Sequence, residues 1–462
     1  MFQQKEFDII YSKDYNSFAY RKYIMRLTSD DFGNKKVSKL IIKMAPPVML
    51  AQLIQALYNI IDSIFIGNYS SSGLTALSII YPIQLLMIAI AVGSGVGINT
   101  LISYLLGKKE NEKALDVKSL GTIIAIVLYL LFSLIAFFIM PTFASISSKS
   151  DEVITDIISY GRIVSVFSFG LFLESIWTKI HQSYGNMRQP MIAQIVGAII
   201  NIVLDPILIF VFKLGVSGAA YATIIGQITA AIIVFKGGFR KPTNIINSLP
   251  YIKKIYELGF PNILMQAAYT FYIFGLNQIL KKFSDDAITA LGIYYKWQTF
   301  FFIPLGSLQT CIVPIISYNY STNNIKRCTD TLKYAVIYGL ALMLIGTISF
   351  ELIPRQMIRV FSSNLNVIDI GEVGFRFIGI SFIPMVTSLI FPVFFQALDK
   401  PIKSSVLTIV RTLILFVPLG FLFSLIGLNY FWLTFPITET ITSIVGYILY
   451  KNSFKNINKN TS

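Results

Sequence analysis

The chain has 462 residues, of which 55% are hydrophobic and 13% are charged, so a soluble globular protein is excluded and an integral membrane protein is indicated. The formal net charge of +15 does not indicate a nucleic-acid partner, because the basic residues lie in short loops between apolar runs, where they act as topology signals. The only cysteines, Cys311 and Cys328, and the only histidine, His181, form no CxxC or HExxH spacing, which argues against a metal centre or a disulfide framework.

The first 44 residues are polar and have no apolar core after a basic start, so we expect a cytoplasmic extension and no cleavable signal peptide. Stretches of about 20 apolar residues then predict twelve transmembrane helices. They lie near residues 46–67, 74–105, 119–140, 156–178, 190–212, 216–235, 258–280, 287–318, 333–353, 370–396, 402–424 and 429–449.

The distribution of basic residues predicts that both termini face the cytoplasm. With that orientation the inside segments hold 28 Lys and Arg residues, and the outside loops hold six. The Lys, Asn and Ile bias of the chain is typical of an AT-rich genome. We therefore expect a multi-pass protein of a bacterial cytoplasmic membrane.

A repeat relates the two halves of the chain. Shifting the sequence by 214 positions superposes the region after Pro47 on the region after Pro261 and aligns TALSIIYPIQ with TALGIYYKWQ. Because six spans is an even number, both copies have the same orientation. This predicts an all-α membrane protein with two six-helix bundles related by a pseudo-two-fold axis along the membrane normal, a plan typical of secondary transporters.

The repeat also divides the chain into five parts. We expect the protein to act as a monomer. The expected parts are a polar extension at 1–44, an N-lobe at 45–236, a cytoplasmic linker at 237–257, a C-lobe at 258–450 and a cytoplasmic tail at 451–462.

A polar stripe runs along the first predicted span. Ala51, Gln55, Tyr58 and Asp62 share one helix face by their i, i+4 and i+7 spacing. An aspartate at a membrane helix centre costs roughly 2.5 to 3.5 kcal/mol on insertion scales, so Asp62 should face the bundle interior and serve a function.

The fifth and sixth spans carry further stripes. Gln194, Asn201 and Asp205 share a face of the fifth span, and the proline that follows can kink the helix there. Thr223 and Gln227 lie one turn apart on the sixth span. Carboxylate, carboxamide and hydroxyl oxygens are hard ligands, suited to a proton or to Na⁺.

These segments resemble a known family. NIIDSIFIG, INIVLDPILIF, GVSGAAYATIIGQ and the two-by-six plan are similar to the prokaryotic branch of the multidrug and toxic compound extrusion (MATE) family, over residues 38–450. The resemblance implies twelve helices in two lobes and export of organic, often cationic, compounds driven by Na⁺ or H⁺ influx. It also implies a cation site at Asp62, Asn201, Asp205 and Thr223. We expect four neighbouring polar residues to have a structural or supporting role and not to bind the cation directly: Gln55, Tyr58, Gln194 and Gln227.

The chain departs from another branch of that family, which carries acidic coupling residues on the seventh and tenth helices. Here the seventh span shows Gln266 and Asn277, and the tenth shows Thr387 and Gln396, all neutral. We therefore expect coupling in the N-lobe, with no cofactor beyond the coupling ion.

Other charged residues also lie in or near the spans. Glu174 is close to Lys179, and an interfacial ion pair is favoured over a coupling or substrate carboxylate. Glu439 in the last span can pair with Lys296 or with Arg411, and the sequence leaves both options open.

An aromatic group in the C-half can line a substrate cavity. The segment YYKWQTFFF, together with Met265, Tyr269 and Tyr272, would bind flat organic cations through stacking and cation–π contacts. Packing or lipid-facing positions are equally compatible with these aromatic residues.

The expected function is a secondary antiporter that exports small organic cations. The alternative is a lipid-linked oligosaccharide flippase of the same superfamily, which would favour a cavity lined by Arg and Lys. An intramembrane enzyme would need a His–carboxylate or Ser–Lys pair within the spans, whereas the sole histidine is expected in a solvated loop. A channel would not require the two-lobe repeat. We therefore expect neither an intramembrane enzyme nor a channel.

Overall fold

The computed structural model describes residues 27–241 and 248–459, and within these ranges the secondary structure is helical without strands. The helices are α3 (Ser29–Asn34), α4 (Val37–Tyr69), α5 (Ser71–Gly107), α6 (Asn111–Ser147), α7 (Asp151–Val166), α8 (Phe169–Ser183), α9 (Arg188–Pro206), η2 (Ile207–Val211), α10 (Gly215–Gly238), α12 (Pro250–Leu280), α13 (Asp285–Ser321), α14 (Ile325–Leu352), α15 (Pro354–Arg359), α16 (Leu365–Ala397), α17 (Pro401–Ile409), η3 (Val410–Phe416), α18 (Val417–Ser424), α19 (Leu428–Phe431) and α20 (Thr434–Lys459).

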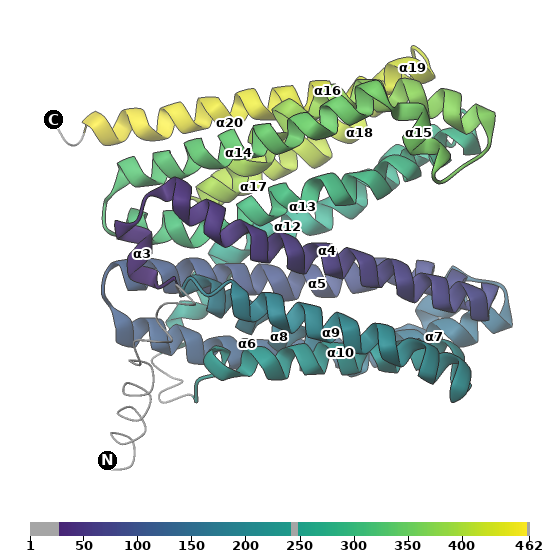
Figure 1. The fold of residues 1–462 in the computed structure, drawn as a ribbon, viewed down its shortest axis with the longest axis horizontal. Coiled ribbons are helices and arrows are strands. Elements are labelled where there is room, and N and C mark those ends of the chain that lie inside the picture. Colours follow the sequence, from purple (N-terminus) through teal and green to yellow (C-terminus); the bar gives the residue numbers. More distant parts are fainter. Residues whose placement is uncertain (1–26, 242–247, 460–462) are drawn as a thin grey trace.

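The helices form two lobes that lie side by side (Figure 1). Helices α4 to α10 build the N-lobe, and α12 to α20 build the C-lobe. In this view α3 and the last turns of α20 lie at one end of the molecule, here called the α3 end. The short helices α15 and α19 lie at the opposite end, here called the α15 end.

The predicted all-helical membrane fold in two lobes is confirmed. The bend between α7 and α8 and the early start of α4 were not predicted from the sequence. Ten helices in the described part of the chain are long and apolar enough to cross a membrane, and the pair α7–α8, bent by 44°, makes an eleventh span. Helix α20 lies where the twelfth span was expected; it has 26 residues but is less apolar, and its first turns hold Thr434, Thr438 and Glu439. Helix α4 also begins at Val37, well before residue 46, because Val37 and Leu40 are buried there.

The repeat extends further than the sequence match indicated. Both bounds of α13 lie 214 positions after the bounds of α5, and both begin after a serine, Ser70 or Ser284, whose hydroxyl accepts a hydrogen bond of 3.1 Å from the third backbone N–H. The start of α14 lies 214 positions after that of α6, and α16 spans the positions that match α7 and α8 together. The same bundle is therefore built twice, once with a fourth span bent between α7 and α8 and once with a fourth span that is one continuous helix.

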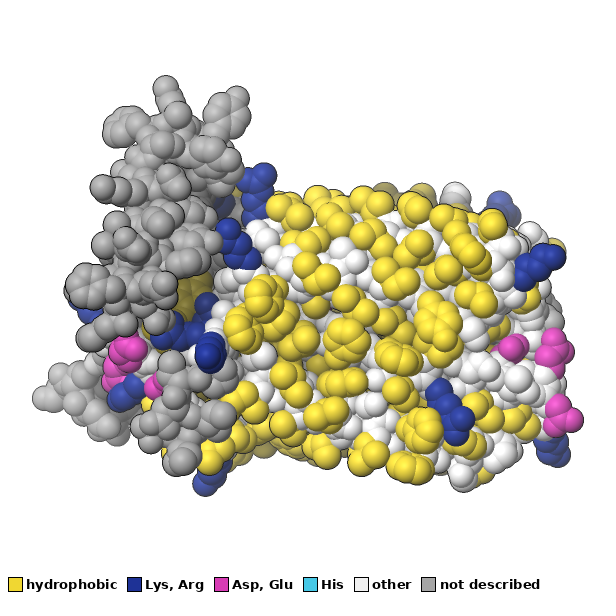
Figure 2. Space-filling view, turned by 90° about the horizontal axis from the view of Figure 1, so that it is seen from below, with side chains coloured by type: hydrophobic (Ala, Val, Ile, Leu, Met, Phe, Trp, Pro, Cys, Tyr) yellow, Lys and Arg dark blue, Asp and Glu magenta, His cyan; other side chains and the backbone are white. Residues whose placement is uncertain are grey.

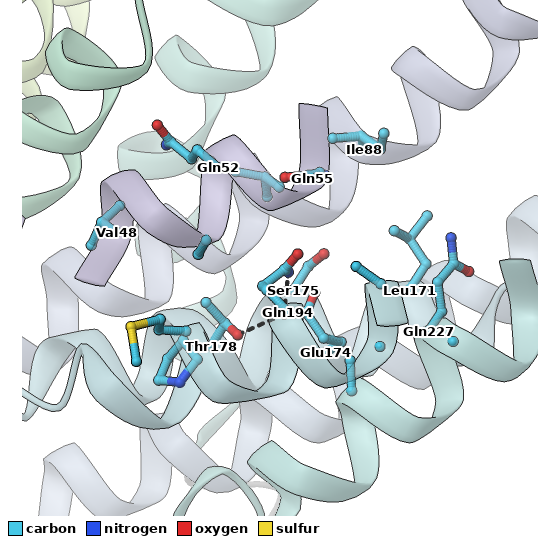
Figure 3. Close-up of a pocket in the computed structure, with 18 of the residues that line it drawn as sticks. Val48, Gln52, Gln55, Ile88, Leu171, Glu174, Ser175, Thr178, Gln194 and Gln227 are labelled. Carbon is cyan, nitrogen blue, oxygen red and sulfur yellow. Dashed lines mark hydrogen bonds between the residues drawn. The ribbon is translucent and has the colours of Figure 1, made fainter. Parts of the chain in front are cut away.

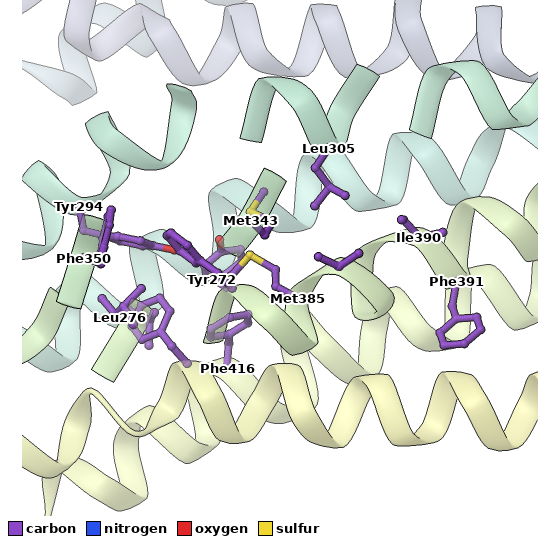
Figure 4. Close-up of a cluster of buried hydrophobic side chains, with 14 of the residues drawn as sticks. Tyr272, Leu276, Tyr294, Leu305, Met343, Phe350, Met385, Ile390, Phe391 and Phe416 are labelled. Atoms are coloured by element: carbon purple, nitrogen blue, oxygen red, sulfur yellow. The ribbon is translucent and has the colours of Figure 1, made fainter. Parts of the chain in front are cut away.

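The lobes share a hydrophobic core at the α3 end. There Leu308, Cys311 and Ile315 of α13 join a cluster that is otherwise built mainly from N-lobe residues. The N-lobe cluster that includes Ile66 and Tyr160 contains no C-lobe residue among those described, and the main C-lobe cluster packs around Tyr272 and its aromatic neighbours (Figure 4). Hydrophobic contacts between the lobes are thus concentrated toward the α3 end.

The outer surface is suited to hydrocarbon. A broad band of hydrophobic side chains covers the face shown in Figure 2, with Lys and Arg gathered toward both ends. On α6, for example, Leu134 and Phe138 are 60% and 68% exposed. Such a surface is stable in lipid and would be an aggregation liability in water.

Candidate functional site

The structure brings the four predicted cation ligands together within the N-lobe. Asp62 comes from α4, Asn201 and Asp205 from α9, and Thr223 from α10, and α9 packs against both other helices. All four side chains are buried, Asp205 completely. Asp62 lies within electrostatic range of Asp205.

The close approach of α9 and α10 positions Asn201 and Thr223. A Cβ added to Gly226 would lie 2.7 Å from the backbone oxygen of Gly197, so only glycine allows the two backbones to come so near. Immediately after Asp205 the helix passes through Pro206 into the π-helix η2. Proline frees a backbone carbonyl one turn back, and π-helical turns are frequent at functional sites.

Three side-chain oxygens of this site lack a hydrogen-bond donor among the described residues. Asp62 Oδ1, Asn201 Oδ1 and Asp205 Oδ2 are buried and accept no hydrogen bond from any described residue. The one side-chain bond within the group runs from Asn201 Nδ2 to Asp205 Oδ1, at 3.4 Å. No described Lys or Arg lies within 4.0 Å of either carboxylate.

Buried oxygens without donors fit a positively charged ligand. Two ionised carboxylates in a low-dielectric site repel each other, and a proton or a small cation relieves both that repulsion and the missing hydrogen bonds. The donor set of carboxylate, carboxamide and hydroxyl oxygens suits Na⁺. In the described part of the chain no three His, Cys, Asp or Glu side chains group together as a transition-metal site would require.

A cavity of about 310 Å³ adjoins the site (Figure 3). Asn201 and Thr223 belong to its lining, whereas Asp62 and Asp205 lie outside the lining. The four residues predicted to support the cation site, Gln55, Tyr58, Gln194 and Gln227, all line the same cavity.

The C-lobe contributes to the cavity in a way that sequence analysis missed. Gln266 of α12 and Thr310 of α13 are part of the lining, as is Gln52 of α4. Gln52 and Gln266 are counterparts in the 214-residue repeat, so the repeat contained a signal that polar residues at this position face the lobe interface.

The structure places the aromatic residues predicted for a substrate cavity elsewhere. Met265, Tyr269 and Tyr272 do not line the N-lobe cavity. Tyr272 is almost fully buried in the C-lobe core and stacks on Phe416, and the Tyr269 hydroxyl donates to Gln298 Oε1 at 3.2 Å. Their role in substrate binding stays a prediction.

Two expectations for the fourth span are corrected. Glu174 makes no ion pair with Lys179; it is buried in the cavity wall, where Thr178 and Gln194 donate hydrogen bonds to it. His181 is not in a solvated loop; it lies in the last turn of α8 and is 4% exposed, with Nε2 at 3.0 Å from the Val234 oxygen. His181 differs because α8 runs several residues beyond the apolar stretch and packs against α10. Glu174 does not pair with Lys179 because positions five apart on one helix point in different directions.

In the C-lobe, Glu439 pairs with Arg411 and not with Lys296. Arg411 Nη2 lies 2.5 Å from Glu439 Oε1, and both side chains are buried. Lys296 instead lies over the ring of Phe361, 4.8 Å from its centroid.

Comparison with known proteins agrees with this architecture. A family model described as MatE matches residues 47–207 and 261–422. The multidrug export protein MepA of Staphylococcus aureus is 24% identical over 427 residues, covering 90% of this chain and 94% of the relative, and MepA of Staphylococcus saprophyticus is 24% identical over 426 residues with the same coverage.

Solved structures show the same fold. A multidrug resistance MATE family transporter of the MOP superfamily, in an outward-facing conformation, has a TM-score of 0.87 at 22% identity, covering 92% of this chain and 98% of that one. A MOP superfamily transporter from Pyrococcus furiosus has a TM-score of 0.86 at 21% identity, covering 93% and 98%. The family match spans well over half of the sequence in two copies, one per lobe, and the chain therefore belongs to the MatE family, the multidrug and toxic compound extrusion transporters.

Proposed function

We propose that this chain is a secondary antiporter that exports small organic, cationic compounds in exchange for inward Na⁺ or H⁺. The observation that carries the proposal is a pair of buried carboxylates, Asp62 and Asp205, that have no cationic partner among the described residues and adjoin a cavity of about 310 Å³. The names of the curated relatives, multidrug export proteins, support drug export as the outcome.

Coupling follows from residues shared between the two sites. Asn201 and Thr223 belong both to the cation site and to the cavity wall. When a cation or proton binds at Asp62 and Asp205, it draws these side chains toward the carboxylates and changes the cavity. Substrate and coupling ion then disfavour each other, which is the differential affinity that exchange requires.

The membrane potential supplies the driving force. Each monovalent charge that moves inward gains about 2.3 kcal/mol per 100 mV. One such charge sustains a substrate gradient of about 50-fold, because 1.4 kcal/mol corresponds to tenfold.

The orientation we propose places the α3 end in the cytoplasm of a bacterial cell membrane. Lys and Arg are concentrated in the segments assigned to that side, which supports cytoplasmic termini. The shared core at the α3 end then closes the lobes toward the cytoplasm. We further propose that one chain is the transporting unit, since each lobe contributes to the cavity.

The test is efflux of ethidium from proteoliposomes under imposed Na⁺ or H⁺ gradients. Wild type, Asp62→Asn and Asp205→Asn are compared, with Asp369→Asn as the matched control, because Asp369 is an exposed carboxylate paired with Arg355 at the α15 end. We expect gradient-driven efflux in wild type and control, and its loss in both site variants.

The other results would contradict the proposal. Gradient-driven efflux that survives both site substitutions would move coupling away from the N-lobe carboxylates. No efflux of any organic cation would favour the lipid-linked oligosaccharide flippase instead.

A further inference from the structure

A basic side chain near the surface of the N-lobe takes no part in the cation site or in the lining of the cavity. Arg162 lies on α7, 11 positions after the first residue of that helix, Asp151, and therefore about 16 Å along the axis from that end. Helix α7 begins at the α15 end of the molecule (Figure 1). Arg162 is thus inside the expected span 156–178, where a charged side chain needs a partner or access to the lipid headgroups.

The surroundings of Arg162 are apolar and belong to the outer surface. The guanidinium carbon lies 4.9 Å from the centroid of the Phe137 ring on α6, which makes a cation–π contact. Phe137 is exposed, as are Leu134 and Phe138 beside it on the same helix. The arginine is therefore bordered by side chains of the kind that contact hydrocarbon.

The charge of this side chain is not compensated within the described part of the chain. Arg162 Nε is buried and donates no hydrogen bond to any described residue. No described carboxylate lies within 4.0 Å of the guanidinium nitrogens. Contact with one aromatic ring covers a face of the guanidinium but leaves the N–H donors in its plane without acceptors.

The C-lobe contains the same arginine with its charge compensated. Arg376 of α16 is the counterpart of Arg162 in the 214-residue repeat, and each lies 11 positions after the start of its helix. Arg376 Nη2 lies 3.2 Å from Glu372 Oε1, and its Nη1 lies 4.0 Å from Glu351 Oε2. Two carboxylates, one on the same helix and one on α14, therefore neutralise this position in the C-lobe.

The N-lobe has apolar residues in place of both carboxylates. Phe137 occupies the position that matches Glu351, and Ile158 occupies the position that matches Glu372. The N-lobe thus keeps the arginine and lacks its two acidic partners. Because a charge within a span is costly without a counter-charge, the difference between the two copies indicates an anionic partner from outside the chain.

We propose that Arg162 binds the phosphate group of an acidic phospholipid, such as phosphatidylglycerol, in the leaflet at the α15 end. A guanidinium donates two parallel hydrogen bonds to a phosphate, and the apolar stem of arginine lets its charged end reach from a span toward the headgroups. The acyl chains of the lipid lie along the exposed side chains of Leu134 and Phe138. In the proposed orientation of the protein this is the outer leaflet.

The lack of a carboxylate beside Arg162 determines the class of lipid. Phosphatidylcholine carries a cationic group next to its phosphate, and no described carboxylate within 4.0 Å of Arg162 is present to receive that group. An acidic phospholipid has a net negative charge, which complements the uncompensated charge of the arginine. A free phosphate ion has the charge but no apolar part to cover the exposed side chains around it.

Native mass spectrometry of the detergent-solubilised protein tests the proposal. Delipidated protein is titrated with dioleoylphosphatidylglycerol, with dioleoylphosphatidylcholine or with inorganic phosphate. The two lipids have the same acyl chains and differ in the headgroup, whereas inorganic phosphate has no acyl chain. We expect wild type to bind its first phosphatidylglycerol molecule about tenfold more tightly than phosphatidylcholine, and to retain no inorganic phosphate.

Matched variants assign the preference to Arg162. Arg162→Gln should remove the tenfold preference, whereas Arg162→Lys keeps the charge and should retain most of it. Arg376→Gln removes the counterpart arginine, whose charge is already paired, and should leave the preference unchanged. Phe137→Glu supplies the acidic partner that the C-lobe has at this position and should abolish the preference with Arg162 still in place. Size-exclusion profiles verify folding, and Arg162→Met replaces the Gln variant if that variant is not monodisperse.

Four results would overturn the proposal. They are equal affinity of wild type for the two lipids, a preference that survives both Arg162→Gln and Phe137→Glu, an equal loss of preference in the Arg376 variant, and retention of inorganic phosphate in place of lipid. The titration uses neither an ion gradient nor a drug, so its outcome is independent of the proposed antiport.

Discussion

The buried pair of Arg411 and Glu439 shows how a single residue pair is held inside the C-lobe. Arg411 Nε and Nη2 donate to the Glu439 carboxylate, and Ser388 donates to the same group from α16. The guanidinium also lies over the ring of Phe416, 5.1 Å from its centroid. Arg411 is presented from the π-helix η3, where the extra residue per turn rotates the following side chains relative to an α-helix.

Removing one partner of this pair should be far more harmful than removing both. Glu439→Gln leaves a buried guanidinium without a counter-charge, and we expect a loss of about 3 to 5 kcal/mol in the free energy of unfolding. The double variant Arg411→Met with Glu439→Leu should recover most of that loss. The measurement is thermal unfolding in detergent, with Glu351→Gln as a control at the half-exposed ion pair with Arg376. Equal unfolding midpoints for wild type and Glu439→Gln would contradict the prediction.

Among the helices, α5 and α12 make the closest contact between the lobes. A Cβ on Gly97 would lie 2.1 Å from the Ile255 oxygen, and one on Gly259 would lie 2.5 Å from the Gly93 oxygen. The two backbones therefore touch directly, as small residues allow in membrane bundles. Because these glycines lie in the halves of α5 and α12 nearer the α3 end, they hold the lobes together on that side.

A methyl group at this contact should open the α3 end. We expect Gly97→Ala to raise the labelling rate of Cys311 by a membrane-permeable maleimide several-fold, because Cys311 is fully buried in the core that the lobes share. A Cys328→Ser background leaves one reactive thiol. Gly292→Ala is the matched control, since a Cβ at Gly292 meets no atom within 4 Å. Unchanged labelling in the Gly97 variant would show that the contact does not limit opening.

The helices, and the polar residues that the structure buries within them, could be predicted from the sequence for physical reasons, whereas the role of these residues as cation ligands stays a prediction. Apolar spans are long and uninterrupted, and polar residues such as Asp62 and Asp205 stand out within them, so both are visible without coordinates. The 44° bend between α7 and α8, and the extension of α8 to Ser183, leave no comparable mark in the sequence. The hydrogen bond from Gln194 to Glu174 depends on how α8 lies against α9, and the sequence does not show that packing.

For the whole molecule, the segment before the first span connects the two lobes. Arg327, in the first turn of α14, donates to the backbone oxygens of Phe32 and Lys35 at 2.6 Å and 2.7 Å. The Phe32 ring is fully buried and meets Tyr318 of α13 edge-on. On the N-lobe side, Leu27 lies against Gly185 in the connection between α8 and α9. Residues 1–26 of the polar extension predicted at 1–44 lie outside the described residues. From residue 27 onward the same segment forms this bridge between the lobes.

Release of this bridge is required if the lobes are to separate at the α3 end, so Arg327→Ala should favour separation. Two hydrogen bonds from a charged donor are worth about 1.5 to 3 kcal/mol each, which allows a population shift of about tenfold or more. The measurement is the distance between spin labels at Glu112 and Asp330, one per lobe, in a background lacking Cys311 and Cys328. Arg376→Ala, which removes an ion pair with Glu372 on the C-lobe alone, is the control. Longer label distances in the Arg327 variant only would support the conclusion that the bridge restrains separation of the lobes at the α3 end. Identical distance distributions in all three proteins would show that the glycine contact of α5 and α12 holds the lobes together without the bridge.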